Sequence, residues 1–396
     1  MRILHYIAHV RGEDLLSQYL TTLTTIQERM GAEVCVVTKR DDMGAKFDQF
    51  LPHIVHIHTL WSWPSAQVAQ LARKRNCGVV ISTHGQLDAF RCCHERKWRK
   101  RMALLTFQRR MICQADALLA TDEREAKCLE KLGWNNHIDT ITNALLDASV
   151  SQEEMAALSL KLYQKVVDTR YAHYLSAEDH EIMGSLLHAA IDDMPSATLS
   201  AEKVGRLHTL DGEQWRRICL WADDEDVMPL IAKAIHLLSI DAPLQENAPS
   251  GINRFPQKHP KKRGGLTDNE LLYASDGSKE KWQEVLHDET ESLQKVVTLI
   301  LNARTLDQHR ELSLHHMCDL YTAIKFLDYD EDQLKSLLSR FSATGIGRAL
   351  MGWLAQKLLL TEGFMPLKPK RKPKIKSLIS NNHNVKQSLN QSIYGS

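Results

Sequence analysis

Short apolar, β-branched runs alternate with helical stretches through the first third of the chain, and this alternation limits the possible folds more than any other feature. The runs typical of buried strands are residues 3–10, 33–38, 54–58, 78–83, 117–120 and 138–142. Strands that alternate with helices form βαβ units, whose parallel strands build one sheet with helices on both faces. The sequence therefore predicts a Rossmann-like α/β domain over residues 1–148, with ligands binding at the carboxyl ends of its strands.

Beyond this domain the spacing of apolar residues becomes helical throughout. It predicts an all-α region made of a helical region at 149–245 and a helical domain at 269–365. Residues 246–268 are rich in Pro, Gly and basic residues, which is typical of a flexible linker. Residues 366–396 begin with six Lys or Arg in PLKPKRKPKIK and continue with Asn, Ser and Gln, which predicts a disordered basic tail.

Composition limits the class of protein and its location. Apolar residues make up 43% of the chain and its formal net charge is +1, so the sequence predicts a globular protein without a general attraction to nucleic acid. The eight cysteines show no CxxC pair, no signal peptide is recognisable, and no uncharged apolar run reaches about 18 residues. We expect a cytoplasmic protein without a metal or cofactor. Peripheral contact with the anionic inner face of a membrane remains open through its basic segments.

The loop after the first strand is the first candidate for a binding role. It reads Ala8-His9-Val10-Arg11-Gly12-Glu13 and leads into a helix, whose N-terminus favours negative charge. Arg11 could meet a phosphate and Gly12 could let the backbone approach a diphosphate. An ordinary strand-to-helix turn explains the loop equally well.

A second candidate segment is HIHTLWSWP at residues 56–64, at the end of the third predicted strand. The rings of Trp61 and Trp63 are large apolar faces that suit stacking on a sugar. Tryptophans beside a strand end also serve often as core or interface residues, so both interpretations stay open.

Three further segments occur in a recognisable order: GVVISTHGQLDAF at 78–90, ADALLATDEREAKCLEKLG at 115–133 and IDTITNAL at 138–145. Together with the strand end at 56–58 they resemble the N-terminal, acceptor-side domain of GT-B glycosyltransferases of family 4. The resemblance covers about residues 1–145. It implies an activity that uses a nucleotide sugar as donor substrate.

The resemblance also implies roles for individual residues. His84 would lie against the transferred sugar and hydrogen-bond it, which makes His84 the candidate catalytic residue. Gly85 would let the backbone approach the substrate, and Asp88 and Asn143 correspond to the loop acid and the final asparagine of the family pattern. A structural histidine at a strand end is the alternative interpretation of His84.

A basic helix is expected between Arg91 and Arg110, with eight Lys or Arg against the single acid Glu95. Interleaved apolar residues make it amphipathic, so it could lie on an anionic membrane or hold a pyrophosphate-linked lipid acceptor. The alternative is the solvated outer face of a packed helix.

Enzymes of this family carry a second Rossmann-like domain with a Glu-x7-Glu motif that holds the donor, and we find no such pattern after residue 150. The sequence therefore leaves two hypotheses. The first is a glycosyltransferase-like protein of cell-surface polysaccharide or lipid-linked glycan synthesis, which keeps the acceptor-side half and needs a donor-domain partner. If active, it would be a retaining hexosyltransferase that acts on a glycan or lipid-linked acceptor. The second is a non-catalytic binding or regulatory protein whose helical part binds a partner. Nucleic-acid binding rests on charge runs alone and is the weakest interpretation.

Overall fold

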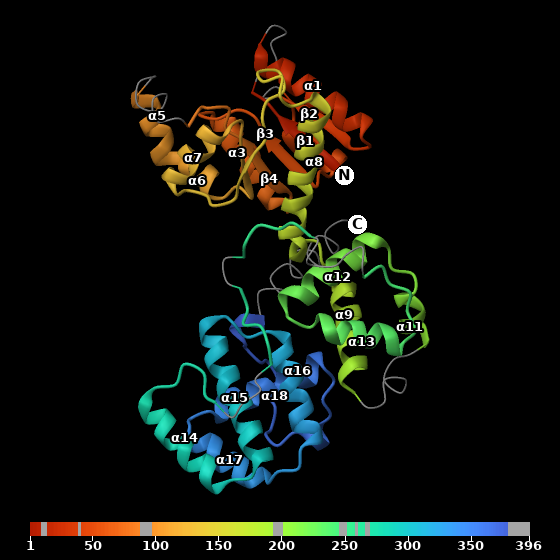
Figure 1. Ribbon diagram of the computed structural model, residues 1–396, viewed down its shortest axis with the longest axis vertical. Coiled ribbons are helices and arrows are strands. Elements are labelled where there is room, and N and C mark those ends of the chain that lie inside the picture. Colours follow the sequence, from red (N-terminus) through yellow and green to blue (C-terminus); the bar gives the residue numbers. More distant parts are fainter. Residues whose placement is uncertain are drawn as a thin grey trace. The chain divides into compact units, whose positions relative to one another are not determined.

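The computed structural model describes residues 1–8, 14–38, 41–87, 97–192, 201–244, 252–257, 260–265 and 270–378. Contacts between residues divide the described chain into two units. The first comprises Met1–Arg170 together with Asn253–Pro256, and the second comprises the other described residues from Tyr171 onward. Figure 1 labels the helices and strands of both units along the chain.

The first unit is built on six parallel strands in the order β2-β1-β3-β4-β5-β6. The strands are β1 (Arg2–Tyr6), β2 (Glu33–Val37), β3 (Ile54–Ile57), β4 (Gly78–Ser82), β5 (Ala117–Ala120) and β6 (Ile138–Thr140). The three central strands β3, β4 and β5 are buried at every position, as expected when helices cover both faces of a parallel sheet. The Rossmann-like prediction is therefore confirmed.

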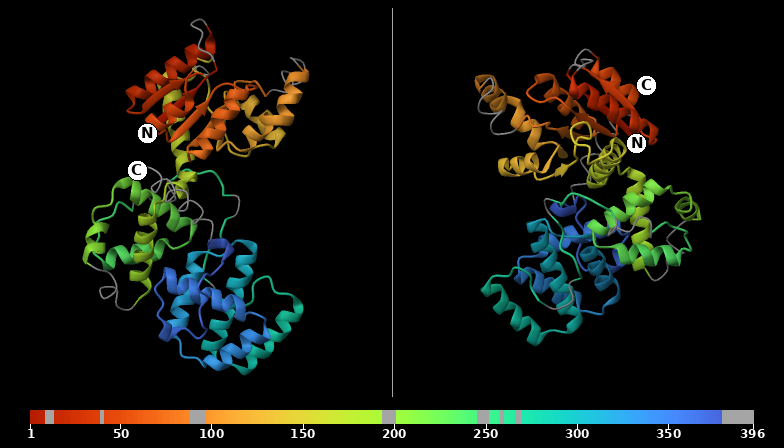
Figure 2. Two further views of the ribbon diagram at one scale, coloured as in Figure 1. Left: turned by 180° about the vertical axis from the view of Figure 1, so that it is seen from behind. Right: turned by 45° about the horizontal axis from the view of Figure 1, so that its top comes forward.

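Helices cover the sheet on two faces. Helices α1 (Leu15–Arg29) and α8 (Gln152–Thr169) pack on one face, and Figures 1 and 2 show α8, in yellow, running beside the red α1. The other face carries α2 (Met43–Phe50), α3 (Trp63–Lys74), α6 (Arg109–Cys113) and α7 (Glu123–Leu132). The α5 helix (Lys97–Ala103) continues through one π-helical stretch, η1 (Leu104–Gln108), into α6. Side chains alternate between the faces, so Val80 of β4 points to the first and Val79 to the second.

The first unit extends further along the chain than the predicted limit at residue 148. Ser151 caps the N-terminus of α8, and the buried Leu162 and Val166 of this helix pack on the sheet. At its end, Arg170 forms an ion pair with Asp116 over 2.7 Å. Because an amphipathic helix after the last strand still covers the sheet, the boundary between the two units lies directly after Arg170.

The segment 246–268 also differs from the prediction of a flexible linker wherever it is described. In the first unit, Phe255 is buried and its ring stacks on that of His137 at 4.5 Å between centroids. In the second unit, the backbone of Lys262 donates a hydrogen bond of 2.9 Å to the carbonyl of Glu311. The Pro- and Lys-rich composition indicates an absence of regular structure, but it does not reveal these specific partners.

The second unit contains helices and connecting segments, with no strand among its described residues. The helices are α9 (Ala177–Ile191), α11 (Ala201–Leu207), α12 (Gly212–Asp224), α13 (Met228–Leu237), α14 (Asp276–Asp288), α15 (Glu291–His309), α16 (Leu314–Phe326), α17 (Glu331–Arg340) and α18 (Thr344–Lys357), with 3-10 turns at η2 (Tyr171–His173), η4 (Glu362–Phe364) and η5 (Lys376–Leu378). The prediction of a helical region is confirmed. One continuous cluster of buried side chains joins Leu186 of α9, Trp282 of α14 and Leu354 of α18, so the two predicted helical segments share one core.

Residues 366–378, which we call the C-terminal strap, are ordered rather than part of a disordered tail. Leu367 and Ile375 are only 5% and 1% exposed, and both belong to the core of the second unit. The backbone N–H of Ser377 donates a 2.7 Å hydrogen bond to the carboxylate of Asp307. Two apolar side chains placed among the basic ones are enough to anchor the segment. The rest of the predicted tail, 379–396, lies outside the described residues.

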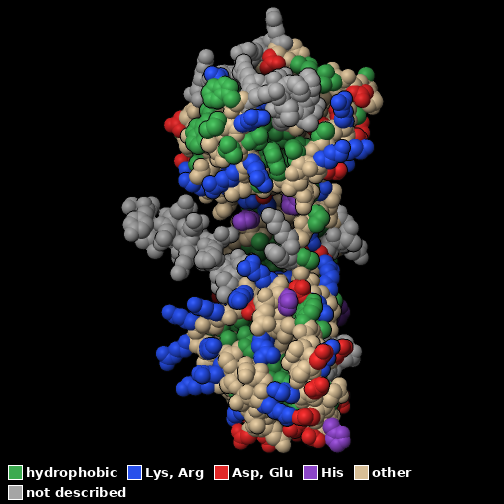
Figure 3. Space-filling model, turned by 90° about the vertical axis from the view of Figure 1, so that its left-hand side faces the viewer, with side chains coloured by type: hydrophobic (Ala, Val, Ile, Leu, Met, Phe, Trp, Pro, Cys, Tyr) green, Lys and Arg blue, Asp and Glu red, His purple; other side chains and the backbone are tan. Residues whose placement is uncertain are grey.

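The strap exposes its basic side chains while it buries its apolar ones. All six Lys and Arg of the strap are exposed, and Figure 3 shows Lys and Arg side chains gathered on one side of the second unit. The strap crosses α18 at Gly352, where an added Cβ would overlap the carbonyl oxygen of Lys370. Glycine at this position therefore allows the close approach.

We expect Gly352→Ala to destabilise the second unit by about 2 kcal/mol, because overpacking against a fixed backbone outweighs the higher helix propensity of alanine. Gly345→Ala in the same helix is the matched control, since a Cβ there meets nothing within 4 Å. The control should be neutral or slightly stabilising. Urea denaturation measures both, and equal stability of the two variants would contradict the described path of the strap.

Candidate functional site

Three histidines replace apolar residues on the sheet face that α1 and α8 cover. His5 lies in β1, His56 lies in β3, and the sheet register pairs these two residues directly. His58 follows β3 and points to the same side, because side chains alternate along a strand. All three are fully buried, so each ring nitrogen needs a hydrogen-bond partner.

Helices α1 and α8 supply part of these partners. His56 Nδ1 lies 2.6 Å from the hydroxyl of Tyr163 on α8, and His56 Nε2 lies 2.7 Å from Ser82 Oγ at the end of β4. The amide Nε2 of Gln27 on α1 donates to the same tyrosine hydroxyl. The Tyr163 hydroxyl therefore joins Gln27 to His56.

A chain of hydrogen bonds leads from Gln27 to the predicted catalytic residue His84. Gln27 Oε1 lies 2.9 Å from His5 Nε2, His5 Nδ1 lies 2.9 Å from His58 Nε2, and His58 Nδ1 lies 3.4 Å from His84 Nε2. Because the amide oxygen can only accept, His5 carries its proton on Nε2 and accepts from His58 on Nδ1. The same logic places the proton of His58, and then that of His84, on Nε2, and it makes Nδ1 of His84 an acceptor.

Burial keeps the rings of this chain neutral. Desolvation lowers the pKa of His5 to about 4, and the hydrogen bond to Gln27 only partly opposes this. Desolvation also lowers the pKa of His84 to about 4, against the opposing charge of Glu125. The pKa values of His56 and His58 are lowered well below the usual 6.5 by burial and by the neighbouring histidines. His84 is thus presented as an uncharged imidazole at neutral pH.

The turn after β4 sets the position of His84. His84 and Gly85 both have positive φ, 44° and 69°, so the backbone turns sharply at the carboxyl end of the strand. The buried carboxylate of Glu125, in the first turn of α7, accepts hydrogen bonds from Gly85 N–H and from the hydroxyl of Thr83. It also accepts from the backbone of Thr121 at 2.7 Å, which ties this turn to the end of β5.

Trp61 lies against the same turn. Its indole Nε1 donates a 3.2 Å hydrogen bond to the carbonyl of Gln86, and its backbone N–H donates to Gln108 Oε1 at 2.9 Å. The ring is half-buried, and the ammonium of Lys100 lies 5.3 Å from its centroid. The structure thus brings Trp61 to the loop that carries His84.

The other predicted site residues lie apart from His84 or outside the described residues. Trp63 begins α3 on the opposite face of the sheet, where its ring meets that of Phe107 edge-on at 5.3 Å. Asn143 is buried after β6 and its Oδ1 accepts from the backbone of Leu145, which is a turn-forming role. Arg11, Gly12 and Asp88 lie outside the described residues.

The histidines also have the spacing of metal ligands. One nitrogen from each of His5, His56 and His58 lies within 4.8 Å of the others. However, both ring nitrogens of His5 and of His56 already make hydrogen bonds within the protein. These histidines therefore serve as hydrogen-bonding groups in the described structure. We call the hydrogen-bonded chain Gln27–His5–His58–His84 the histidine relay.

The sequence did not single out His5, Gln27, His56, His58, Glu125 and Tyr163 as site residues. A signal was present in the histidines at 5, 56 and 58, because charged or polar residues are unusual inside buried parallel strands. No comparable signal exists for Gln27 and Tyr163, whose partners are distant in sequence.

Part of the first unit matches a known protein family. Residues 42–144 match the family model of the glycosyl transferase 4-like domain. This segment runs from the start of α2 to the turn after β6 and contains Trp61, His84, Gly85 and Asn143. The resemblance seen in the sequence is confirmed for these residues. Searches of curated proteins and of solved structures gave no match to the chain.

Proposed function

We propose that the first unit is the acceptor-binding half of a glycosyltransferase of cell-surface polysaccharide or lipid-linked glycan synthesis. A partner would supply the domain that holds the nucleotide sugar. The observation that carries this proposal is His84: an uncharged histidine on a tight turn at the carboxyl end of β4, within the segment that matches the glycosyl transferase 4-like domain.

The chemistry of His84 suits a sugar ligand. With its proton on Nε2 and directed to His58, the ring uses Nδ1 to accept a hydrogen bond from a hydroxyl group. A neutral ring needs no counter-ion in a site of low dielectric constant. Gly85 adds no side chain beside it, so a ligand can approach the backbone, and Trp61 adds an apolar face on the same loop.

The second unit supports the need for a partner. A sugar transferase of two Rossmann-like halves places donor and acceptor between them, and this positioning supplies much of the rate acceleration. The described residues from 171 to 378 form helices instead of a second parallel sheet. In the described part of the chain, no helix is long and apolar enough to cross a bilayer.

The alternative is a non-catalytic binding or regulatory protein built on the same domain. The helical second unit favours it, because a unit without a recognisable donor site would serve to bind another protein. In this case the histidine relay would stabilise the fold without contributing to transfer.

An incorporation assay with labelled UDP- and GDP-sugars distinguishes the two proposals. Isolated protein should transfer no sugar above background, and an extract of source cells depleted of this protein should regain labelled glycan when wild-type protein is added. His84→Ala should lower that incorporation at least about 100-fold, the scale of losing a group that acts in the transition state. His287→Ala, an exposed histidine of the second unit, is the control.

Equal incorporation with wild type and His84→Ala would support the non-catalytic alternative. Strong transfer by the isolated protein, abolished by His84→Ala, would refute the need for a partner.

A further inference from the structure

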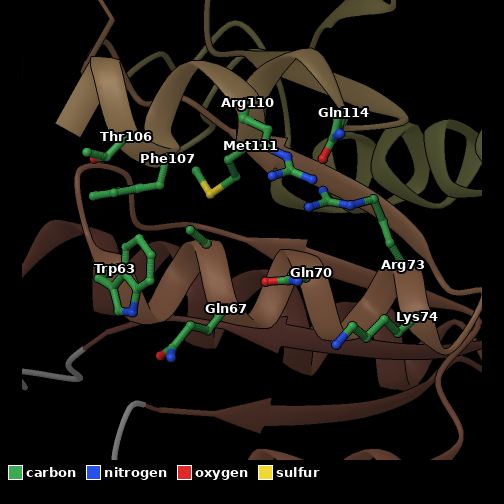
Figure 4. Close-up of a pocket in the computed structure, with 11 residues that line it drawn as sticks. Trp63, Gln67, Gln70, Arg73, Lys74, Thr106, Phe107, Arg110, Met111 and Gln114 are labelled. Atoms are coloured by element: carbon green, nitrogen blue, oxygen red, sulfur yellow. The ribbon is translucent and has the colours of Figure 1, made fainter.

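A pocket of about 350 Å³ lies between α3 and the η1–α6 segment, on the sheet face opposite to the histidines. Figure 4 shows that its two ends differ in chemistry: Trp63 and Phe107 lie at one end, and Arg73, Arg110 and Gln114 lie at the other. Its volume is within the range of small-molecule sites. It therefore has room for an amphiphilic ligand.

The basic end holds the half-buried Arg73 and the exposed Arg110, and Arg73 has an unsatisfied donor. The guanidinium groups of Arg73 and Arg110 point toward one another in Figure 4, and no Asp or Glu lines the pocket. Arg73 Nη1 is buried without a hydrogen-bond partner, which is unfavourable for a donor that is removed from water. Burial, followed by the charge of Arg110, lowers the pKa of Arg73, and the carboxylate of Asp116 opposes this only in part. An anion between the two groups would satisfy the donor and offset the repulsion.

The apolar end opens to solvent. The ring of Trp63 is 56% exposed although it packs edge-on against Phe107. A chain of methylene groups leaving the pocket would cover the exposed part of this ring.

We propose that this pocket binds a phosphate monoester attached to an apolar chain, as in an anionic membrane lipid, with the phosphate between Arg73 and Arg110. Planar guanidinium groups bind phosphate oxygens in pairs, which gives strong and directional hydrogen bonds. Trp63 and Phe107 then contact the first part of the apolar chain. The site uses none of the residues around His84, so it stands independently of the proposed function.

Calorimetric titration of the full chain with dihexanoyl phosphatidic acid, as a monomer in solution, tests the proposal. Arg73→Gln and Arg110→Gln should each weaken binding about tenfold or more, the loss of a charge-assisted hydrogen bond. Arg109→Gln is the matched control, because Arg109 is the exposed neighbour of Arg110 and does not line the pocket. It removes the same charge and should change the affinity less than twofold. Equal losses in all three variants would overturn the proposal, since they would indicate general attraction to positive charge.

Inorganic phosphate separates the two ends of the pocket. It should bind at least about tenfold more weakly than the lipid, because it buries no apolar surface. Trp63→Ala should weaken the lipid about tenfold and leave inorganic phosphate unchanged. Equal affinities of the lipid and inorganic phosphate for the wild-type protein would show a site for a free anion and overturn the apolar half of the proposal.

Discussion

Ending the chain at Met365 should lower the free energy of unfolding of the second unit by about 5 kcal/mol or more, whereas ending it at Leu378 should change it little. The shorter chain loses Leu367 and Ile375 from the core, and each large buried aliphatic side chain contributes about 2–5 kcal/mol. It also leaves the buried carboxylate of Asp307 without the backbone donor of Ser377.

Thermal and urea denaturation of the two truncated chains and the full chain measure this difference. The chain that ends at Leu378 is the control, because it retains every described residue of the strap. If the chain that ends at Met365 unfolds at the same urea concentration as the control, the strap contributes no stability and its described packing is contradicted.

Acidification from pH 7 to pH 5 should destabilise the first unit by several kcal/mol. His5 and His84 have pKa values of about 4 in the folded chain and about 6.5 when unfolded. The unfolded chain therefore binds more protons between these values, so the stability present above pH 6.5 is lost as the pH falls toward 4. Linkage gives about 2 kcal/mol for each such histidine at pH 5.

Urea denaturation at a series of pH values, followed by a probe in the first unit, measures the effect. His5→Gln should flatten the dependence between pH 6.5 and 4 by about one proton per molecule. His287→Gln, with an exposed ring, is the control and should leave the slope unchanged. A first unit whose stability is constant over this range would contradict the neutral, buried state of the histidine relay.

The sheet could be predicted because its strands are apolar at nearly every position, and this pattern is local in sequence. The packing of the strap could not be predicted, because its two buried residues, Leu367 and Ile375, lie among six basic residues. The mean composition of the segment therefore indicates disorder. Its packing also depends on Gly352, which lies on a helix about twenty residues earlier. Local composition does not contain such a contact.

The candidate site, too, could be predicted only in part from the local sequence. His84 was predicted from the resemblance, but the relay that fixes its protonation depends on Gln27 and Tyr163, which two different helices bring to the sheet. Trp61 and Trp63 are two residues apart, and both were predicted to stack on a sugar. The left-handed backbone at Trp61 (φ 58°) separates them, so that Trp61 joins the turn of His84 and Trp63 joins the pocket beside α3.

Burial among its neighbours holds His84 neutral, with its proton on Nε2. Long-range ¹H–¹⁵N NMR of histidine-labelled protein, assigned with His84→Ala and followed from pH 7.5 to the acid limit of folding, tests it directly. We expect His84 to be the Nε2–H tautomer and to take up a proton only near pH 4. A wild-type His84 that titrates near pH 6.5, or that carries its proton on Nδ1 at neutral pH, would show that burial and the hydrogen bond to His58 do not fix its protonation.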